Sequence, residues 1–193
     1  MPLTNRCQAA GGVLWSLALM LLLLCLLLLQ AAGDPGRMAA LLNAHADPAV
    51  TGVSPGEHPA LARRITAYLL GGEESLQSTL LIRGQPRAAF SQKELLHMAD
   101  VRGLFLLCRR LLVLCAFIVA GGLAAAVIRR RLRALARAFL FTGLGAVLIG
   151  AFLFVWGMAD FDGLFLLFHH AAFTNDLWLL NPREDLLVQL MPT

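Results

Sequence analysis

The sequence is short of charged residues. Only 15% of its 193 residues are charged, whereas 59% are hydrophobic, and an average soluble domain carries roughly 25% charged residues. Together with a mean hydropathy of +0.72, this composition excludes a disordered chain and predicts that much of the apolar surface faces lipid. In a membrane protein, the net charge of +4 reflects arginines that set the topology. We therefore expect no nucleic-acid partner.

The sequence also lacks the motifs of the familiar catalytic and metal sites. It has no G-x-S-x-G, no H-E-x-x-H and no phosphate-binding loop. Its cysteines have no metal-binding or redox spacing, so we interpret them as small apolar residues: Cys7, Cys25, Cys108 and Cys115. We expect no metal, no cofactor and no serine or cysteine nucleophile.

Three apolar stretches are long enough to cross a bilayer, whose hydrocarbon core takes a helix of about 20 residues. They are residues 11–32, 103–128 and 138–158. In the second, Arg109 and Arg110 lie near one end, where long side chains reach the headgroups. A cleaved signal peptide is the alternative for the first stretch, but its apolar run exceeds the roughly 7–15 residues of such peptides. Small residues in the third predict close packing of another helix: Gly143, Gly145, Ala146 and Gly150.

The arginines predict the topology. Residues 129–137, RRRLRALAR, hold five of them, and the positive-inside rule places this loop in the cytoplasm. The N-terminal residues 1–10 then also lie inside. Residues 33–90 form a small extracytoplasmic cap of short helices, residues 91–128 an interfacial helix running into the second span, and residues 159–193 an outer interfacial or re-entrant segment. The predicted fold class is an all-α integral membrane protein with three transmembrane helices.

Titratable residues gather in two strings that this topology places outside. In FSQKELLHMADVRGLF, Ser91 and Glu94 have the S-x-x-E spacing of a capping box, which predicts a helix from Gln92. Glu94, His97 and Asp100 then fall near one face of that helix. His97 beside Asp100 is either an imidazole oriented by a carboxylate for general-base catalysis or a hydrated interfacial histidine. The second string follows the third span and holds further polar and aromatic residues: His169, His170, Asp176, Trp178 and Asp185.

The two strings together resemble a known pair of signatures. The first has His-Met-x-Asp-Val-Arg before the second span, and the second, FHHAAFTNDLWLLNPREDLLVQLMP, has Phe-His, Asn-Asp, Trp, Asp-Leu-Leu and a late Pro. Both resemble the lipoprotein intramolecular transacylase family of Gram-positive bacteria. The resemblance implies an enzyme at the outer face of the bacterial cytoplasmic membrane. It would move the sn-2 acyl chain of a diacylglyceryl-modified lipoprotein to the α-amino group of its N-terminal cysteine, giving a lyso-form lipoprotein.

The resemblance also implies a set of site residues. Such a transfer needs no enzyme nucleophile, because the substrate's amine attacks the substrate's own ester, but it needs a base and hydrogen-bond donors. Carried over by position, His97 and His169 are the catalytic pair, with His169 favoured over His170 and Asp100 orienting His97. The implied partners are diacylglyceryl lipoproteins and membrane phospholipid. The implied supporting or substrate-binding residues are Arg102, Asp176, Trp178, Asp185 and Glu94.

Two alternatives and one departure remain open at this point. The alternatives are a non-catalytic three-span module that binds a partner or lipid, and a lipid-ester hydrolase that uses water in the same site. Side chains of His97 and His169 that lie within about 7 Å of each other and face one lipid-accessible cavity favour the enzyme, and histidines on opposite faces favour the module. The departure is that the resemblance implies a fourth span after the late proline, whereas the sequence ends at Thr193. We expect a truncated sequence or a member with three spans.

Overall fold

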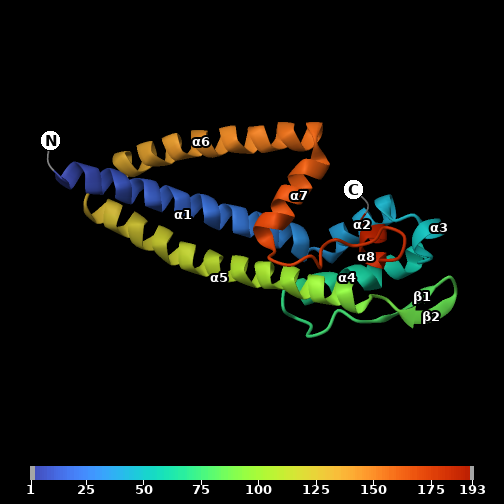
Figure 1. Cartoon of the computed structure of the whole chain (residues 1–193). Helices are drawn as coiled ribbons and strands as arrows, with labels where there is room; N and C mark the ends of the chain where they lie inside the picture. Colours follow the sequence, from blue (N-terminus) through green and yellow to red (C-terminus); the bar gives the residue numbers. More distant parts are fainter. Residues whose placement is uncertain (1–2, 192–193) are drawn as a thin grey trace. The chain divides into compact units, whose positions relative to one another are not determined.

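The structure, a computed structural model, describes residues 3–191, with side chains described from Ala10 onward (Figure 1). Three of its helical segments are long and apolar enough to cross a membrane: Ala10–Gly33, Gln92–Ile128 and Leu132–Ala159. The predicted all-α membrane fold with three spans is thereby confirmed. The late proline Pro192 and the point at which a fourth span would begin lie outside the described residues.

The chain divides into two compact units. The first comprises residues 1–27 and 108–166, and the second comprises residues 28–107 and 167–193. Each unit is built from segments that are distant in the sequence. All of the sequence-predicted site residues belong to the second unit.

In the first unit, glycines bring the long helices α1 (Leu3–Gly33) and α5 (Gln92–Ile128) together. The indole nitrogen of Trp15 on α1 donates a hydrogen bond of 2.9 Å to the backbone oxygen of Val119 on α5. A Cβ atom at Gly122 would lie 2.2 Å from Cδ1 of the same indole ring. Because no side chain fits at that distance, glycine at position 122 is what allows the tryptophan to lie against the backbone of α5.

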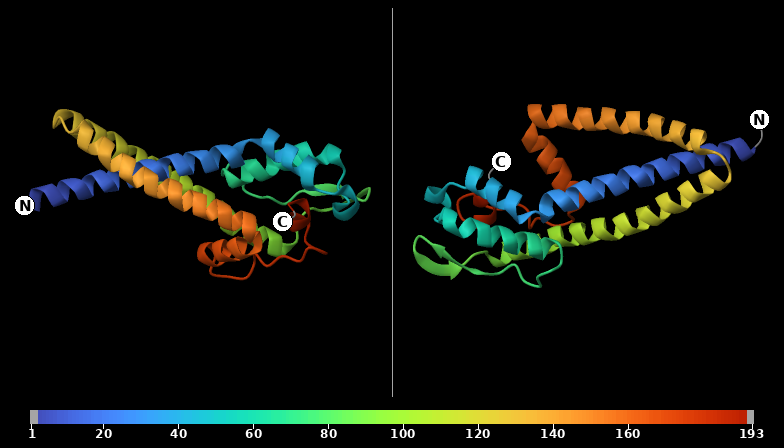
Figure 2. Two further views of the ribbon diagram at one scale, coloured as in Figure 1. Left: turned by 90° about the horizontal axis from the view of Figure 1, so that it is seen from above. Right: turned by 180° about the vertical axis from the view of Figure 1, so that it is seen from behind.

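The third long helix, α6 (Leu132–Ala159), follows α5 after a short turn in which Arg130 has a φ of 51° (Figure 2). None of its residues is buried, and large apolar side chains such as Phe141 and Met158 are more than three-quarters exposed. Exposed apolar surface on this scale is what lipid chains cover in a membrane helix. Of the predicted packing residues, Gly143 lies near the side chain of Met20, whereas a Cβ at Gly145 or Gly150 would meet open space.

Four short helices follow in the second unit, and the first three of them start at Asp-Pro or Ser-Pro pairs. They are α2 (Pro35–His45), α3 (Pro48–Thr51), the 3₁₀ helix η1 (Pro55–Glu57) and α4 (His58–Leu69). In the first three, the first residue is a proline, and the side chain just before it accepts backbone N–H bonds as the N-cap. A helix start favours this arrangement, because its first backbone N–H groups lack partners within the helix and the fixed φ of proline suits the first helical position. The α2 helix packs along α4.

A β-hairpin interrupts this helical series and was not predicted from the sequence. Strands β1 (Thr79–Ile82) and β2 (Gln85–Ala88) pair antiparallel through the two-residue turn Arg83-Gly84, in which both residues have positive φ. Such turns match the twist of the strands. Arginine rarely adopts this conformation, so the turn carried a weak signal in the sequence.

The C-terminal segment contributes to the core of the second unit. It leaves α7 (Phe161–Ala172) and ends in the short helix α8 (Leu186–Leu190). Leu187 and Leu190 are buried in the same apolar cluster as Leu61 and Ile65 of α4. The segment predicted as interfacial or re-entrant is therefore anchored by buried leucines within this unit.

The second unit also buries a histidine, His58, that is not one of the predicted site residues. His58 is 1% exposed, and its Nδ1 lies 2.7 Å from the side-chain oxygen of Asn43. Its Nε2 has no hydrogen-bond partner among the described residues. Burial therefore lowers the pKa of His58, because the charged imidazolium loses hydration.

Candidate active site

The start of α5 positions the first candidate histidine. The backbone nitrogen of Ser91 donates to the Glu94 carboxylate at 2.6 Å, and the Ser91 hydroxyl accepts from the backbone nitrogen of Glu94 at 3.3 Å. The predicted capping box is therefore confirmed, with the helix starting at Gln92. His97 follows one turn later and is 7% exposed. The cap fixes the helical register that carries this side chain into the interior of the second unit.

The last turn of α7 supplies the second candidate histidine. The ring centroids of His97 and His169 lie 6.2 Å apart, with the ring planes tilted by 35°. The two residues are 72 positions apart in the sequence and come from separate helices. This separation meets the distance part of the catalytic criterion, about 7 Å. His170 instead has its ring 5.1 Å from that of Trp178 and is exposed.

Aromatic rings surround the histidine pair. Phe173 contacts both histidines, with centroid separations of 5.2 Å to His97 and 5.6 Å to His169. Trp178 lies 5.0 Å from His169 and Phe168 lies 5.3 Å from it. Phe173 and Trp178 are buried. Phe168 and Phe173 were not predicted as site residues, although Phe168 is the phenylalanine of the Phe-His match in the second string.

Asp100 is held by an asparagine from the C-terminal segment. The side-chain nitrogen of Asn175 donates to Asp100 Oδ2 at 2.8 Å. The carboxylate also acts electrostatically on His97, one turn earlier on the same helix. Nδ1 of His97 is buried and has no hydrogen-bond partner among the described residues. Asn175 was not predicted as a site residue, although it belongs to the Asn-Asp pair of the second string.

Glu94 and Asp185 fasten the C-terminal segment to α5. Glu94 is 2% exposed, and its second carboxylate oxygen accepts from the backbone nitrogen of Leu187 at 2.6 Å. Asp185 accepts from the Ser91 hydroxyl at 3.3 Å and from the backbone nitrogen of Asn181 at 2.6 Å. Both carboxylates thus bind backbone or hydroxyl donors of the protein itself. Their contacts connect the two strings that carry the histidines.

The remaining predicted residues lie in other surroundings. The guanidinium of Arg102 lies 4.7 Å from the centroid of the Tyr68 ring and donates to the backbone oxygen of Glu74 at 3.4 Å. Arg102 therefore connects α5 to α4 and to the loop between α4 and β1. Asp176 is exposed, and its backbone oxygen accepts from Leu179.

The arrangement offers acid–base chemistry in an aromatic environment. Across the described residues, no three His, Cys, Asp or Glu side chains are grouped as metal ligands would be. Two imidazolium ions at this 6.2 Å separation would repel by about 3 kcal/mol at an effective dielectric constant near 20. This repulsion disfavours a positive charge on both rings at once, so at least one imidazole stays neutral and able to accept a proton.

Comparisons with solved structures support the fold. The chain is similar to the lipoprotein intramolecular transacylase Lit from Bacillus cereus, with 18% identity, a TM-score of 0.70, and coverage of 98% of this chain and 82% of that one. It is also similar to two structures of that protein with one histidine replaced, by arginine (17% identity, TM-score 0.61) or by alanine (16% identity, TM-score 0.62). These matches cover 98% of this chain and 79% or 80% of the other. The comparison with curated proteins found no match.

A family model matches almost the whole sequence. The model for lipoprotein intramolecular transacylase Lit covers residues 13–193, including both strings and all three spans. The family's description, an intramolecular transacylase, is that of an enzyme, which favours the catalytic interpretation over the non-catalytic module. This chain belongs to the lipoprotein intramolecular transacylase family, Lit.

Proposed function

We propose that this protein transfers the sn-2 acyl chain of a diacylglyceryl-modified lipoprotein to the α-amino group of the lipoprotein's N-terminal cysteine. The observation that carries the proposal is the pairing of His97 and His169, from two separate helices, at 6.2 Å. In this reaction the amine nitrogen forms a bond to the ester carbonyl carbon, and the bond from that carbon to the sn-2 oxygen breaks. The products are an amide and a free hydroxyl on glycerol, so no external acyl donor or water is consumed.

The histidine pair supplies the proton transfers that this exchange requires. One neutral imidazole accepts the proton that the amine loses as it attacks. The other, as imidazolium, donates a proton to the departing alkoxide. Proton transfer by positioned side chains contributes about 10²–10⁴-fold to a rate. Holding amine and ester together within one substrate contributes the entropic advantage of an intramolecular reaction.

Asp100 and Asn175 influence the charge on the His97 ring. His97 is the more buried ring of the pair and loses hydration when it is charged, which favours its neutral, proton-accepting form, and the nearby Asp100 carboxylate partly offsets that loss once the ring has accepted a proton. Asn175 fixes that carboxylate by its 2.8 Å hydrogen bond. We therefore assign His97 as the base and His169 as the acid, with Asp100 and Asn175 as positioning residues.

The aromatic rings suit an amphiphilic substrate. Phe173, Trp178 and Phe168 offer apolar surface next to the two imidazoles. Such surface contacts acyl and glyceryl carbons while it excludes the water that would hydrolyse the ester. The same rings would contact diacylglyceryl lipoprotein and neighbouring phospholipid.

The topology completes the proposal. Diacylglyceryl lipoproteins have their modified cysteine at the outer leaflet of the bacterial cytoplasmic membrane, as the resemblance implies. The five arginines of residues 129–137 support a cytoplasmic position for that loop, by the positive-inside rule. The N-terminus then lies inside, and the site-bearing residues 33–107 and 167–193 lie toward the outer leaflet.

The experiment is to express single variants in a strain that lacks its usual N-acylation step and to identify lipoprotein N-termini by mass spectrometry. With the unchanged chain we expect lyso-form lipoprotein. His97→Ala and His169→Ala should each lower its amount by at least about 100-fold, since each removes one proton transfer. Undiminished lyso-form product in either variant would remove that residue from the mechanism.

Two histidines outside the pair serve as matched controls. His170→Ala tests the choice between neighbouring histidines, and exposed His45→Ala tests the loss of a histidine in the same unit. Both should keep product within about threefold of the unchanged chain, because surface substitutions usually cost little. The hydrolase alternative predicts released fatty acid and a free α-amino group instead of the N-acyl product.

A further inference from the structure

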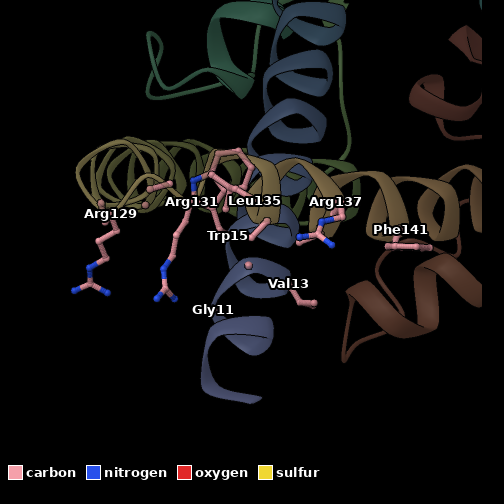
Figure 3. Close-up of a pocket in the computed structure, with 14 residues that line it drawn as sticks. Gly11, Val13, Trp15, Arg129, Arg131, Leu135, Arg137 and Phe141 are labelled. Atoms are coloured by element: carbon pink, nitrogen blue, oxygen red, sulfur yellow. The ribbon is translucent and has the colours of Figure 1, made fainter. Parts of the chain in front are cut away.

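A groove lies in the first unit, which holds none of the candidate site residues. It has a volume of about 760 Å³ and is lined by α1, the end of α5, the connecting turn and the start of α6 (Figure 3). Most of its lining is small or apolar, such as Gly12, Ala134 and Phe141. Its remaining lining is basic: Arg129, Arg131 and Arg137. A volume of this size is within the range of roughly 300–1,000 Å³ typical of ligand pockets.

The three arginines reach the groove from different positions. Figure 3 shows the Arg129 and Arg131 side chains extending in the same direction from the end of α5 and the turn after it, with Arg137 on the first turns of α6. All three are exposed. The other two arginines of the loop, Arg130 and Arg133, do not line the groove. Three of the five arginines in residues 129–137 therefore line the groove.

These charges have no acidic counter-charge near them within the first unit. Residues 1–27 and 108–159 contain no aspartate or glutamate. The acidic residues of this unit, Asp160 and Asp162, lie beyond the opposite end of α6, about 40 Å away at 1.5 Å per residue. At that distance they are screened in any physiological buffer.

The helix end adds to the positive potential. The first turn of α6 has no acidic residue, and its N-cap, Arg131, makes no side-chain capping bond. Unsatisfied N–H groups give a helix N-terminus a partial positive charge. The arginines thus lie at the end of α6 where a positive charge is unfavourable unless an anion is present.

We propose that this groove binds one phospholipid with an anionic headgroup, from the leaflet in which the loop of residues 129–137 lies. The phosphate and its headgroup lie among Arg129, Arg131 and Arg137, and an acyl chain lies along the small residues between α1 and α6. Arginine suits this role because its planar guanidinium binds phosphate oxygens in pairs. The positive-inside rule accounts for arginines in the loop as a whole, but not for an apolar groove bordered by three of them.

Thermal unfolding of the purified, delipidated full chain in a non-ionic detergent tests the proposal. The added probes are phosphatidylglycerol, phosphatidylcholine and inorganic phosphate. A ligand that binds only the folded protein raises the unfolding midpoint. We expect phosphatidylglycerol to raise it and the other two to leave it unchanged. An equal rise with inorganic phosphate would identify a free anion as the ligand, and an equal rise with phosphatidylcholine would show that the charge is not recognised; either result overturns the proposal.

Two double variants with the same loss of charge separate the groove from general electrostatics. Arg129→Gln with Arg131→Gln should weaken phosphatidylglycerol binding about 30-fold, on the usual contribution of two basic residues near an anionic membrane. Arg130→Gln with Arg133→Gln should change it less than about threefold. Equal weakening in both would contradict a built site. Ala134→Trp keeps every charge and fills the groove, so it should also abolish the phosphatidylglycerol effect; an unchanged effect would exclude an acyl chain there.

Discussion

Replacing Glu94 with glutamine perturbs the contact that fastens the C-terminal segment to α5. One carboxylate oxygen accepts from the backbone nitrogen of Ser91 and the other from that of Leu187, each at 2.6 Å. Glutamine has nearly the same shape, but one of its two terminal groups is an NH₂. Whichever way the carboxamide turns, a donor then faces one of the two backbone N–H groups.

The free energy lost in Glu94→Gln follows from these contacts. An unsatisfied buried donor costs about 1–3 kcal/mol, and the bond that survives loses its charge assistance. Since Glu94 is 2% exposed, solvent offers little compensation. We expect a loss of about 2–3 kcal/mol in the free energy that holds α8 in place, which corresponds to roughly 30- to 150-fold more opening of that segment.

Hydrogen exchange followed by mass spectrometry measures this opening directly. Amides of residues 186–190 should exchange roughly 30- to 150-fold faster in Glu94→Gln than in the unchanged chain. The matched control is Glu184→Gln, an exposed glutamate in the same segment, which should leave exchange unchanged. Unaltered exchange in Glu94→Gln, or equal acceleration in both variants, would refute the assignment of Glu94 as the fastening residue.

Two further perturbations address the packing of each unit. In Gly122→Ala the new methyl group would meet the Trp15 ring at 2.2 Å, so we expect destabilisation by about 1–3 kcal/mol. In the control Gly121→Ala the new methyl group meets open space, and the thermal unfolding midpoint should hold or rise; equal midpoints in the two variants would contradict the packing account. His58 has a pKa lowered by burial, so the unfolded chain binds more protons than the folded one. Its contribution to stability is then complete above about pH 6.5 and is lost as the pH falls below that value. The midpoint measured at pH 8 and at pH 5.5 should fall more in the unchanged chain than in His58→Gln, and equal falls would show that His58 does not contribute.

Local patterns in the sequence predicted much of this fold. The apolar stretches correspond to the three long helices, because length and composition alone set what can cross a bilayer. The S-x-x-E spacing predicted the start of α5 at Gln92. Each of these features depends only on one continuous piece of the sequence.

Contacts between distant segments could not be predicted in the same way. The capping box explained one oxygen of Glu94, but its bond to Leu187 joins residues 93 positions apart. Asn175 and Phe173 meet α5 through the path of the C-terminal segment, and nothing in their neighbours indicates this. The histidine pair was predicted only through the resemblance to a family, since the spacing of His97 and Asp100 also fits a hydrated interfacial histidine.

The most direct test of the proposed reaction follows one acyl chain from donor to acceptor. Purified protein is incubated with a diacylglyceryl lipopeptide that carries a ¹³C-labelled chain at sn-2 only, among unlabelled phospholipids, and the product is sequenced by tandem mass spectrometry. We predict the labelled chain on the α-amino nitrogen of the cysteine and a free hydroxyl at sn-2, with His97→Ala and His169→Ala giving unchanged substrate. An unlabelled chain on the nitrogen, or the label recovered as free fatty acid, would contradict the account.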